Sequence, residues 1–387
     1  MSSTRILTAL LLLSASLAPA CKAQLGKNVM IPAGSDADHQ LNAINAADPS
    51  QKLALIDAFA KANPEPDFQI VADEQYVNYY LNAKQYEKAF EYGEKLFALD
   101  PNNYLNAVNM VRAAAEKGDH AKLFTYGEKA NSILANYKAA PPPEGTNPDD
   151  WSRIRTDKLV ALRDDQDYVE EALIGGAYNA KDPAKRGDYL VRFSKMYPNT
   201  PESEQALAVA ATAYLQAQNR PKMLEVANGV LAKDPDNIDV LLLLADDYSE
   251  RGEQLDKADT YAKKAASLAD TLKKPDNISD EEWQKKITIQ KGWALSSEGQ
   301  VSLQKKQSAQ AVDSLSKAST LLKSNAGLYA RNQYRLGFAY LNLKKTAEAT
   351  KAFTEAASVD SPYRAMAEDK LSELGAVAKT PAHKKPS

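Results

Sequence analysis

The sequence is poor in the residues on which most catalytic and metal chemistry depends. It holds one cysteine, Cys21, and three histidines, His39, His120 and His383. A single thiol excludes internal disulfides and cysteine-based metal cages, and histidines so far apart do not form a local metal-binding cluster. Glycine is also scarce, at 16 of 387 residues, and no glycine-rich phosphate loop, nucleophile elbow or HExxH motif occurs. We therefore expect no enzyme activity, no bound metal and no cofactor.

An excess of charge of one sign is lacking as well. The chain has 48 basic and 51 acidic residues, which gives a net charge of −3 at pH 7. Such a balance creates no field that would attract nucleic acid or an anionic membrane surface, so neither is an expected partner. The 44% of hydrophobic and 26% of charged residues are typical of a folded chain, which excludes wholesale disorder.

Long apolar stretches are missing except at the N-terminus. Arg5 precedes an apolar run over residues 6–13, and small residues follow up to Ala20. This order is typical of a secretory signal peptide, so residues 1–20 are predicted to direct export. Cleavage after Ala20 would leave Cys21 as the first residue, whereas cleavage after position 23 would remove it.

Cys21 directly after the apolar run resembles the lipobox of bacterial lipoproteins, in which the cysteine is lipidated and becomes the N-terminus. Ala18 stands where lipoboxes usually carry leucine, and Pro19 is unusual there. Two readings stay open: either a lipid on Cys21 attaches the chain to a membrane surface, or the cysteine is removed with the leader. We expect an exported chain in the periplasm or attached to the outer membrane, with secretion as the alternative.

Internal repetition carries the organisation of the chain. Residues 48–103 align with residues 182–237 without a gap, with 15 identities in 56 positions. Within this long period lies a shorter one of 34 residues, in which Tyr80, Ala89 and Pro101 mark set positions. The register continues over residues 70–103, 104–137, 167–200, 204–237, 238–272, 292–325 and 330–363.

This pattern resembles the tetratricopeptide repeat (TPR), a 34-residue helix–turn–helix unit. Tyrosine occupies position eleven of four repeats, as Tyr80, Tyr214, Tyr248 and Tyr340. The resemblance implies that small residues let two helices approach closely and that tyrosine fills the space to the next hairpin. A helical bundle would share the 3.6-residue periodicity but has no reason to keep a 34-residue register. We predict an all-α fold, a right-handed α-solenoid of TPR-like hairpins with a C-terminal capping helix.

Both ends of the array depart from the repeat. Residues 33–66 are interpreted as an irregular first hairpin. Residues 364–376 read as an amphipathic helix with Met366, Leu371 and Leu374 on one side, which is expected to cover the last apolar face. The basic, proline-containing tail that follows is expected to be mobile.

Two proline-containing interruptions break the array, and each is followed by a predicted helix start. At the second, Ser279 with Glu282 three residues later has the spacing of a capping box. We interpret both interruptions as loops inserted between hairpins rather than as domain boundaries. The predicted organisation is a signal peptide (1–20), N-terminal repeats (33–137), an inserted loop (138–150), central repeats (151–272), an inserted loop and helix start (273–291), C-terminal repeats with the cap (292–376) and a tail (377–387).

The TPR resemblance implies that ligands bind on the concave face, which the first helix of each repeat forms at about positions two, five, nine, twelve and thirteen. In this chain those positions are amide-rich and mildly acidic. Such a surface suits an extended peptide, because asparagine and glutamine side chains donate and accept hydrogen bonds together. The candidates are Glu74, Asn78, Asn82, Arg112, Glu116, Thr212, Gln216, Asp246, Glu250, Gln300, Gln304, Tyr334 and Asn342.

The function predicted from these patterns is binding rather than catalysis. The acidic pair Asp246–Asp247 could in principle supply an acid and a base, but adjacent helix residues point about 100° apart, so a solvated face explains them more simply. Residues 193–201, FSKMYPNTP, resemble the second-helix signature of TPR proteins of the bacterial cell envelope. We therefore predict a non-catalytic envelope scaffold that binds a protein or peptide partner. The alternative is an envelope lipoprotein that binds a glycan or a small ligand.

Overall fold

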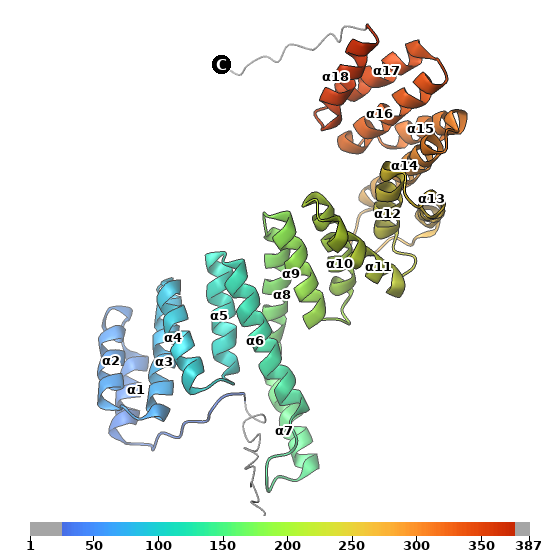
Figure 1. Cartoon of the computed structure of the whole chain (residues 1–387). Helices are drawn as coiled ribbons and strands as arrows, with labels where there is room; N and C mark the ends of the chain where they lie inside the picture. The colour runs from blue at the N-terminus through green and yellow to red at the C-terminus, as the bar shows by residue number, and fades with distance from the viewer. Residues whose placement is uncertain (1–24, 376–387) are drawn as a thin grey trace, which may run out of the picture. The chain divides into compact units, whose positions relative to one another are not determined.

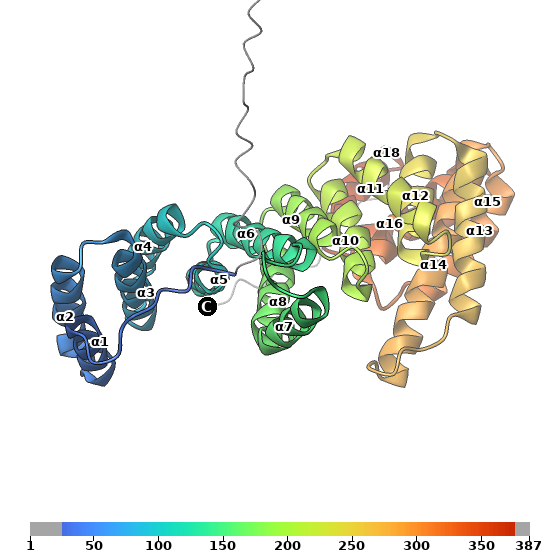
Figure 2. The ribbon, with the colours of Figure 1, turned by 90° about the horizontal axis from the view of Figure 1, so that it is seen from below.

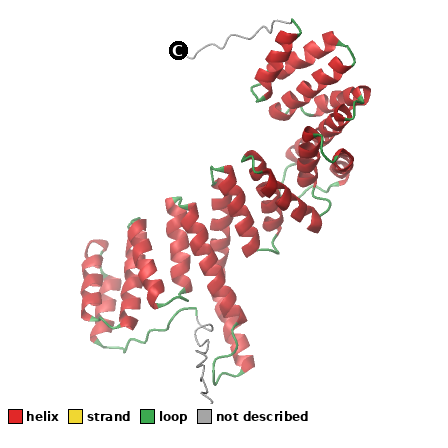
Figure 3. Ribbon diagram, viewed as in Figure 1, coloured by secondary structure: helices red, strands yellow, loops and turns green. Residues whose placement is uncertain are grey.

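A computed structural model describes residues 25–375 of the chain, and its secondary structure there is entirely helical (Figure 3). The predicted signal peptide, the lipidation candidate Cys21 and the predicted tail 377–387 lie outside the described residues. The chain divides into two compact units, Met1–Lys181 and Asp182–Ser387, and the described residues of each are considered separately below. The division falls inside the predicted repeat 167–200, so the two helices of that repeat belong to different units.

The first unit is a stack of helical hairpins in which the first six helices pack consecutively and the eighth packs against the fifth and sixth (Figure 1). The predicted first hairpin, residues 33–66, is present as its first two helices. The helices are α1 (Asp36–Ala46), α2 (Pro49–Ala62), α3 (Pro66–Asn82), α4 (Tyr86–Leu99), α5 (Tyr104–Lys117), α6 (His120–Ala139), α7 (Pro148–Ala161) and α8 (Arg163–Asn179).

The second unit continues with the same kind of hairpin and ends in a single helix. In Figure 2 the first turns of its longest helix, α14, extend past the neighbouring α13 and α15. The helices are α9 (Pro183–Met196), α10 (Pro201–Gln216), α11 (Arg220–Lys233), α12 (Ile238–Arg251), α13 (Leu255–Thr271), α14 (Asp280–Gln304), α15 (Ser308–Leu321), α16 (Ala326–Asn342), α17 (Thr346–Ala357) and α18 (Tyr363–Glu373). The predicted α-solenoid architecture is thus confirmed within each unit.

The turns inside the hairpins share one backbone device. In four repeats the residue two positions after the first helix has a positive φ, as at Lys84, Gln218, Lys306 and Lys344. The next amide then donates back to a carbonyl in the last turn of the first helix, for example Gln85 N to the Tyr80 oxygen at 2.8 Å. This left-handed closure satisfies a carbonyl at the helix end and reverses the chain within three residues.

The first inserted loop is shorter than the predicted range 138–150, whereas the second ends at the predicted helix start, Ser279. The first spans residues 140–147, because α6 runs on to Ala139 and a proline at the first position starts α7. The second spans residues 272–279, and α14 runs unbroken for 25 residues from there. The predicted capping box is confirmed: the Ser279 side chain accepts from the Glu282 amide, and the Glu282 carboxylate accepts from the Ser279 amide. This cap starts the helix twelve residues before the repeat register alone would place it.

The C-terminal helix α18 covers the apolar end of the second unit, as predicted. Ala367 and Leu371 are buried against Ala349, Phe353 and Ala356 of α17. The assignment of Met366 to the same face is wrong, since its side chain is 45% exposed. Residues 366 and 371 differ by five positions, or about 140° around the helix, so they cannot both face α17.

Candidate binding site

In the first unit, the five predicted ligand contacts lie on α3 and α5, and several are held by other side chains. Glu74 is half-buried, and one of its carboxylate oxygens accepts a hydrogen bond from the Asn103 side chain at 3.0 Å. Burial raises the pKa of Glu74, while this hydrogen bond opposes the shift. Asn78 accepts from the Asn109 side chain at 3.4 Å, and Asn82 is exposed.

The other two predicted contacts of this unit lie on α5. Glu116 accepts a hydrogen bond from the Tyr86 hydroxyl at 2.8 Å. The guanidinium carbon of Arg112 lies 5.0 Å from the centroid of the Tyr168 ring, within the range of a cation–π contact. Both side chains are exposed, so they remain accessible to a ligand while their orientations are restrained.

In the second unit, the structure brings five predicted residues together around one cavity of about 660 Å³. We call this the C-terminal cavity. Glu250 of α12, Gln300 and Gln304 of α14, and Tyr334 and Asn342 of α16 all line it. The remaining lining residues are Leu303, Arg335, Phe338, Pro362, Tyr363 and Met366. The first helices of three consecutive hairpins and the capping helix therefore form a single polar and aromatic pocket.

Aromatic rings make up much of the C-terminal cavity wall. The Tyr334 ring centroid lies 5.0 Å from that of Phe338, at an interplanar angle of 78°, and 5.6 Å from that of Tyr363. The edge-to-face contact of Tyr334 with Phe338 is a favourable arrangement of two π systems and restrains both rings. Phe338 was missed by the sequence analysis although it stands at position nine of repeat 330–363, where the same counting that selects Tyr334 and Asn342 would have found it.

The wall is fixed from behind by a buried ion-pair network. Asp246, only 6% exposed, pairs with Arg331 and Arg335 of α16, and the Arg335 Nη2 to Asp246 Oδ1 distance is 2.8 Å. Arg335 also donates to Glu250 Oε1 at 3.0 Å and to the hydroxyl of Ser296 at 2.9 Å. Burial works to raise the pKa of Asp246, but the two guanidinium groups outweigh it and hold that pKa below its usual value. The network ties α12 to α14 and α16.

Two expectations about the acidic pair are corrected by this arrangement. Asp246 and Asp247 are both buried rather than solvated, and Asp247 pairs with Arg220 at 2.7 Å and with Arg251 at 3.2 Å. Asp246 is therefore a structural residue behind the cavity and not a direct ligand contact. Its partners lie 85 and 89 residues later in the sequence, so no local pattern reveals that it is neutralised.

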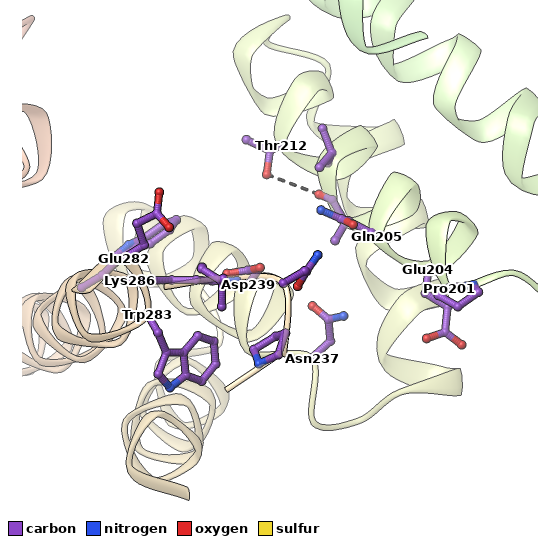
Figure 4. Close-up of a pocket in the computed structure, with 15 residues that line it drawn as sticks. Pro201, Glu204, Gln205, Thr212, Asn237, Asp239, Glu282, Trp283 and Lys286 are labelled. Atoms are coloured by element: carbon purple, nitrogen blue, oxygen red, sulfur yellow. Dashed lines mark hydrogen bonds between the residues drawn. The ribbon is translucent and has the colours of Figure 1, made fainter. Parts of the chain in front are cut away.

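A second cavity, of about 900 Å³, lies between α10, the start of α12 and α14 (Figure 4). We call it the insertion cavity, because Pro275, Asn277 and Ile278 of the second inserted loop line it. Trp283 and Trp293 contribute indole rings, and Asp239 accepts from the Gln290 side chain at 2.7 Å. The first half of α14, which the repeat register does not predict, places Trp283 here.

Thr212 and Gln216 complete the predicted set. Thr212 lines the insertion cavity, with its hydroxyl donating to the Ala208 carbonyl at 3.3 Å (Figure 4). Gln216 is exposed one turn further along α10, and its side-chain oxygen accepts from Arg186 at 2.5 Å. These two candidates thus lie apart from the C-terminal cavity, and their role in binding stays a prediction.

Neither metal-ligand clusters nor membrane spans are found in the part of the chain that the structure describes. Between residues 25 and 375, no three His, Cys, Asp or Glu side chains are placed to hold a metal ion. No helix in that range is both long and apolar enough to cross a membrane.

Comparison with known families bears on the last hairpin directly. Residues 330–363, which cover all but the first four residues of α16, the whole of α17 and the first residue of α18, match the family model described as "Tetratricopeptide repeat". The chain contains a tetratricopeptide repeat. The matched TPR has the register predicted from the sequence, and it contributes Tyr334, Phe338 and Asn342 to the C-terminal cavity. A comparison with the curated proteins finds no match.

Several solved structures are partly similar to the chain. One is NprR in complex with its cognate peptide NprX, at 18% identity and a TM-score of 0.36, with coverage of 87% of this chain and 80% of NprR. Another is yeast Tom70, at 11% identity and a TM-score of 0.33, with coverage of 88% and 94%. A third is the P58(IPK) TPR domain, at 14% identity and a TM-score of 0.28, with coverage of 88% and 98%.

Proposed function

We propose that the protein is an exported, non-catalytic scaffold of the bacterial cell envelope that binds a protein partner through an extended peptide segment. The C-terminal cavity is the principal contact site in this proposal. The observation that carries it is the convergence of α12, α14, α16 and α18 on one pocket with an aromatic wall and a polar rim. Ligand sites of this size combine apolar anchors with a few placed polar groups.

The chemistry of the cavity favours a peptide. Tyr334, Phe338 and Tyr363 offer apolar area for one or two side chains of the partner, and such buried aromatic contacts supply most of the energy in protein recognition. At the rim, Gln300, Gln304 and Asn342 can each donate to a peptide carbonyl and accept from a peptide amide. The ion pairs behind Arg335 keep the wall preformed, which lowers the entropic cost of binding.

A site-specific cross-linking experiment tests this proposal in cells. A benzophenone amino acid at Met366, which is 45% exposed and lines the cavity, should cross-link to a partner protein on irradiation. The matched control carries the same group at Lys317 on α15, a helix that contributes no residue to the cavity. Adding Phe338→Ala to the Met366 derivative should abolish the same product. A product that also forms from Lys317, or that survives Phe338→Ala, would contradict binding at the cavity.

The envelope location rests on the N-terminal sequence and has its own test. Fractionation of cells should recover the protein outside the cytoplasm. If Cys21 is lipidated, the native chain should sediment with membranes, and Cys21→Ser should move it to the soluble periplasmic fraction. Retention of both chains in the cytoplasm would refute export and leave the peptide-binding proposal standing.

A glycan or small-ligand binder is the second candidate, and the insertion cavity is the observation that favours it. Indole rings can stack on the apolar face of a sugar, while Asn237, Asn277 and Asp239 offer groups that hydrogen-bond hydroxyls. Only three tryptophans occur in the chain, so a ligand in this cavity should change the intrinsic fluorescence. Titration with oligosaccharides should produce a saturable change that Trp283→Phe weakens, and the cross-linking result at Met366 would be independent of it.

A further inference from the structure

We propose that the C-terminal cavity is the binding site of the chain's own C-terminal segment, residues 376–387, which an external partner must displace. The inference rests on the proposed function of this cavity as a peptide site. The occupant is the sequence AVAKTPAHKKPS, which begins two residues after α18 ends, following Leu374 and Gly375. Position, side-chain chemistry and charge each favour this occupant.

The position of α18 brings the segment within reach of the cavity. Tyr363 and Met366 line the cavity from the first two turns of α18. One turn further on, the ammonium of Lys370 lies 5.8 Å from the centroid of the Phe338 ring. The helix is about 16 Å long, whereas twelve extended residues span about 40 Å. The segment can therefore turn after Gly375 and run back along α18 to the aromatic wall with chain to spare.

The side chains of the segment suit an aromatic wall. Pro381 and Pro386 favour the extended polyproline II conformation, in which proline rings pack into grooves between aromatic side chains. Tyr334, Phe338 and Tyr363 provide such rings, and Pro362 extends the same surface. A proline-containing segment also loses less conformational entropy on binding than a flexible one, because its φ angles are already restricted.

Charge at the rim complements the segment. The segment carries three lysines, Lys379, Lys384 and Lys385. Three exposed carboxylates lie on the two helices beside the cavity: Asp369 and Glu373 on α18, where Glu373 pairs with Lys370 at 2.8 Å, and Glu250 on α12, which pairs with Arg335. Burial raises the pKa of the Tyr334 hydroxyl, the positive charge of Lys370 opposes this shift, and the negative charges of Glu373, Asp369 and Glu250 add to it. Both hydrogen bonds from Arg335 to Glu250 end on Oε1, so Oε2 can accept from a lysine.

Tethering makes even a weak contact effective. A segment linked through a few residues experiences an effective concentration in the millimolar range at its own site. An intrinsic dissociation constant of about 100 μM would then leave the cavity occupied about nine-tenths of the time. A free ligand would bind the native chain about tenfold more weakly than a chain whose segment cannot dock.

A titration with the segment itself tests the inference on the full chain. The probe is a fluorescent synthetic peptide of residues 376–387, and binding is followed by anisotropy. One protein is the native chain, and the other carries Lys379→Glu, Pro381→Ala, Lys384→Glu and Lys385→Glu, all within the segment. We expect the probe to bind the substituted chain at least fivefold more tightly than the native chain. Equal binding to both chains, or no binding to either, would overturn the inference.

Two controls locate the contact and define its specificity. Phe338→Ala in the substituted chain should abolish probe binding, and a peptide of the same composition in scrambled order should bind at least fivefold more weakly. Binding that ignores either control would reveal a non-specific electrostatic contact and refute docking in the cavity. Intramolecular docking also requires that the native chain's affinity for the probe does not change with protein concentration; a change would assign the segment to a second copy and overturn the proposal.

The result is distinguishable from a failure of the proposed function. The titration uses purified components only, whereas the Met366 cross-link is read in cells against an external partner. A negative titration together with a Phe338-dependent cross-link would refute docking of the chain's own segment and would support the cavity as a peptide site. A positive titration without any cross-linked partner would support docking of the segment and would refute the scaffold proposal.

Discussion

Removal of the Asp246 carboxylate is the most demanding test of how the second unit is held together. In Asp246→Ala, Arg331 loses the carboxylate with which it pairs, and Arg335 keeps Glu250 and Ser296. Two further buried nitrogens of Arg331, Nε and Nη2, already have no hydrogen-bond partner and lie beside the Trp293 ring at a guanidinium-to-centroid distance of 5.9 Å. The substitution therefore leaves a largely buried guanidinium uncompensated.

The expected loss in the free energy of unfolding of Asp246→Ala follows from the burial of Asp246 and of its arginine partners. The side chains of Asp246 and Arg335 are 8% and 3% exposed, and that of Arg331 is 15% exposed. Breaking a buried pair by removing one partner typically costs about 3–5 kcal/mol, and because Arg335 keeps Glu250 we expect about 3 kcal/mol here. With a urea m-value of about 2 kcal/mol/M for a unit of this size, the midpoint should fall by about 1.5 M.

The assay is urea unfolding followed by tryptophan fluorescence, since Trp283 and Trp293 both belong to the second unit. The matched control is Asp256→Ala, which removes an exposed carboxylate paired with Lys305 at 2.7 Å. That pair is solvated, so the midpoint should not move measurably. Equal shifts for Asp246→Ala and Asp256→Ala would refute the claim that the buried network holds the unit.

The same network predicts a pH dependence. The pKa of Asp246 is lower in the folded state than in the unfolded state. The stabilisation that the ionised carboxylate provides is therefore fully present above about pH 4 and is lost as the pH falls through the folded-state pKa. The difference in stability between the native chain and Asp246→Ala should therefore be largest near neutral pH and shrink below it. A difference that stays constant from pH 7 to pH 2.5 would contradict ionisation of Asp246 in the folded protein.

Four further substitutions test packing, buried charge and turn geometry. Gly337→Ala should lower the free energy of unfolding by about 1–3 kcal/mol, because the new methyl carbon would lie 2.5 Å from the Phe353 ring. Gly229→Ala has open space around the new methyl group and should raise the free energy of unfolding by about 0.5–1 kcal/mol. Urea midpoints that move equally in the two variants would contradict this. Burial raises the pKa of Asp73 to about 6. The protonated Asp73 therefore stabilises the folded state at a pH below its pKa in the unfolded chain, and this stabilisation is lost as the pH rises through 6. Asp73→Asn should raise the melting temperature at pH 8 but not at pH 3.5. Lys344 has a φ of 59°, so Lys344→Gly should stabilise by up to about 1 kcal/mol, and a lower melting temperature would refute strain at that turn.

The sequence was sufficient for the features that depend on local periodicity. Position-eleven tyrosines, the small residues that let paired helices touch, and the Ser279–Glu282 cap predicted hairpins and helix starts that the structure contains. These features can be predicted from the sequence because helix packing and capping link residues only a few positions apart, or one hairpin apart in a repeating register. The same counting placed Tyr334 and Asn342 on the cavity-lining helix.

Only the tertiary structure decided which of the polar residues are free to bind. Asp246 and Glu250 stand one helical turn apart and look alike in sequence, yet Asp246 is buried by arginines 85 and 89 residues away while Glu250 reaches the C-terminal cavity. Trp283 lines the insertion cavity because α14 begins before the repeat register resumes. Tyr363 and Met366 line the C-terminal cavity because α18 packs beside α16. Burial and charge compensation are sums over residues distant in the chain, so they emerge only once the hairpins are packed together.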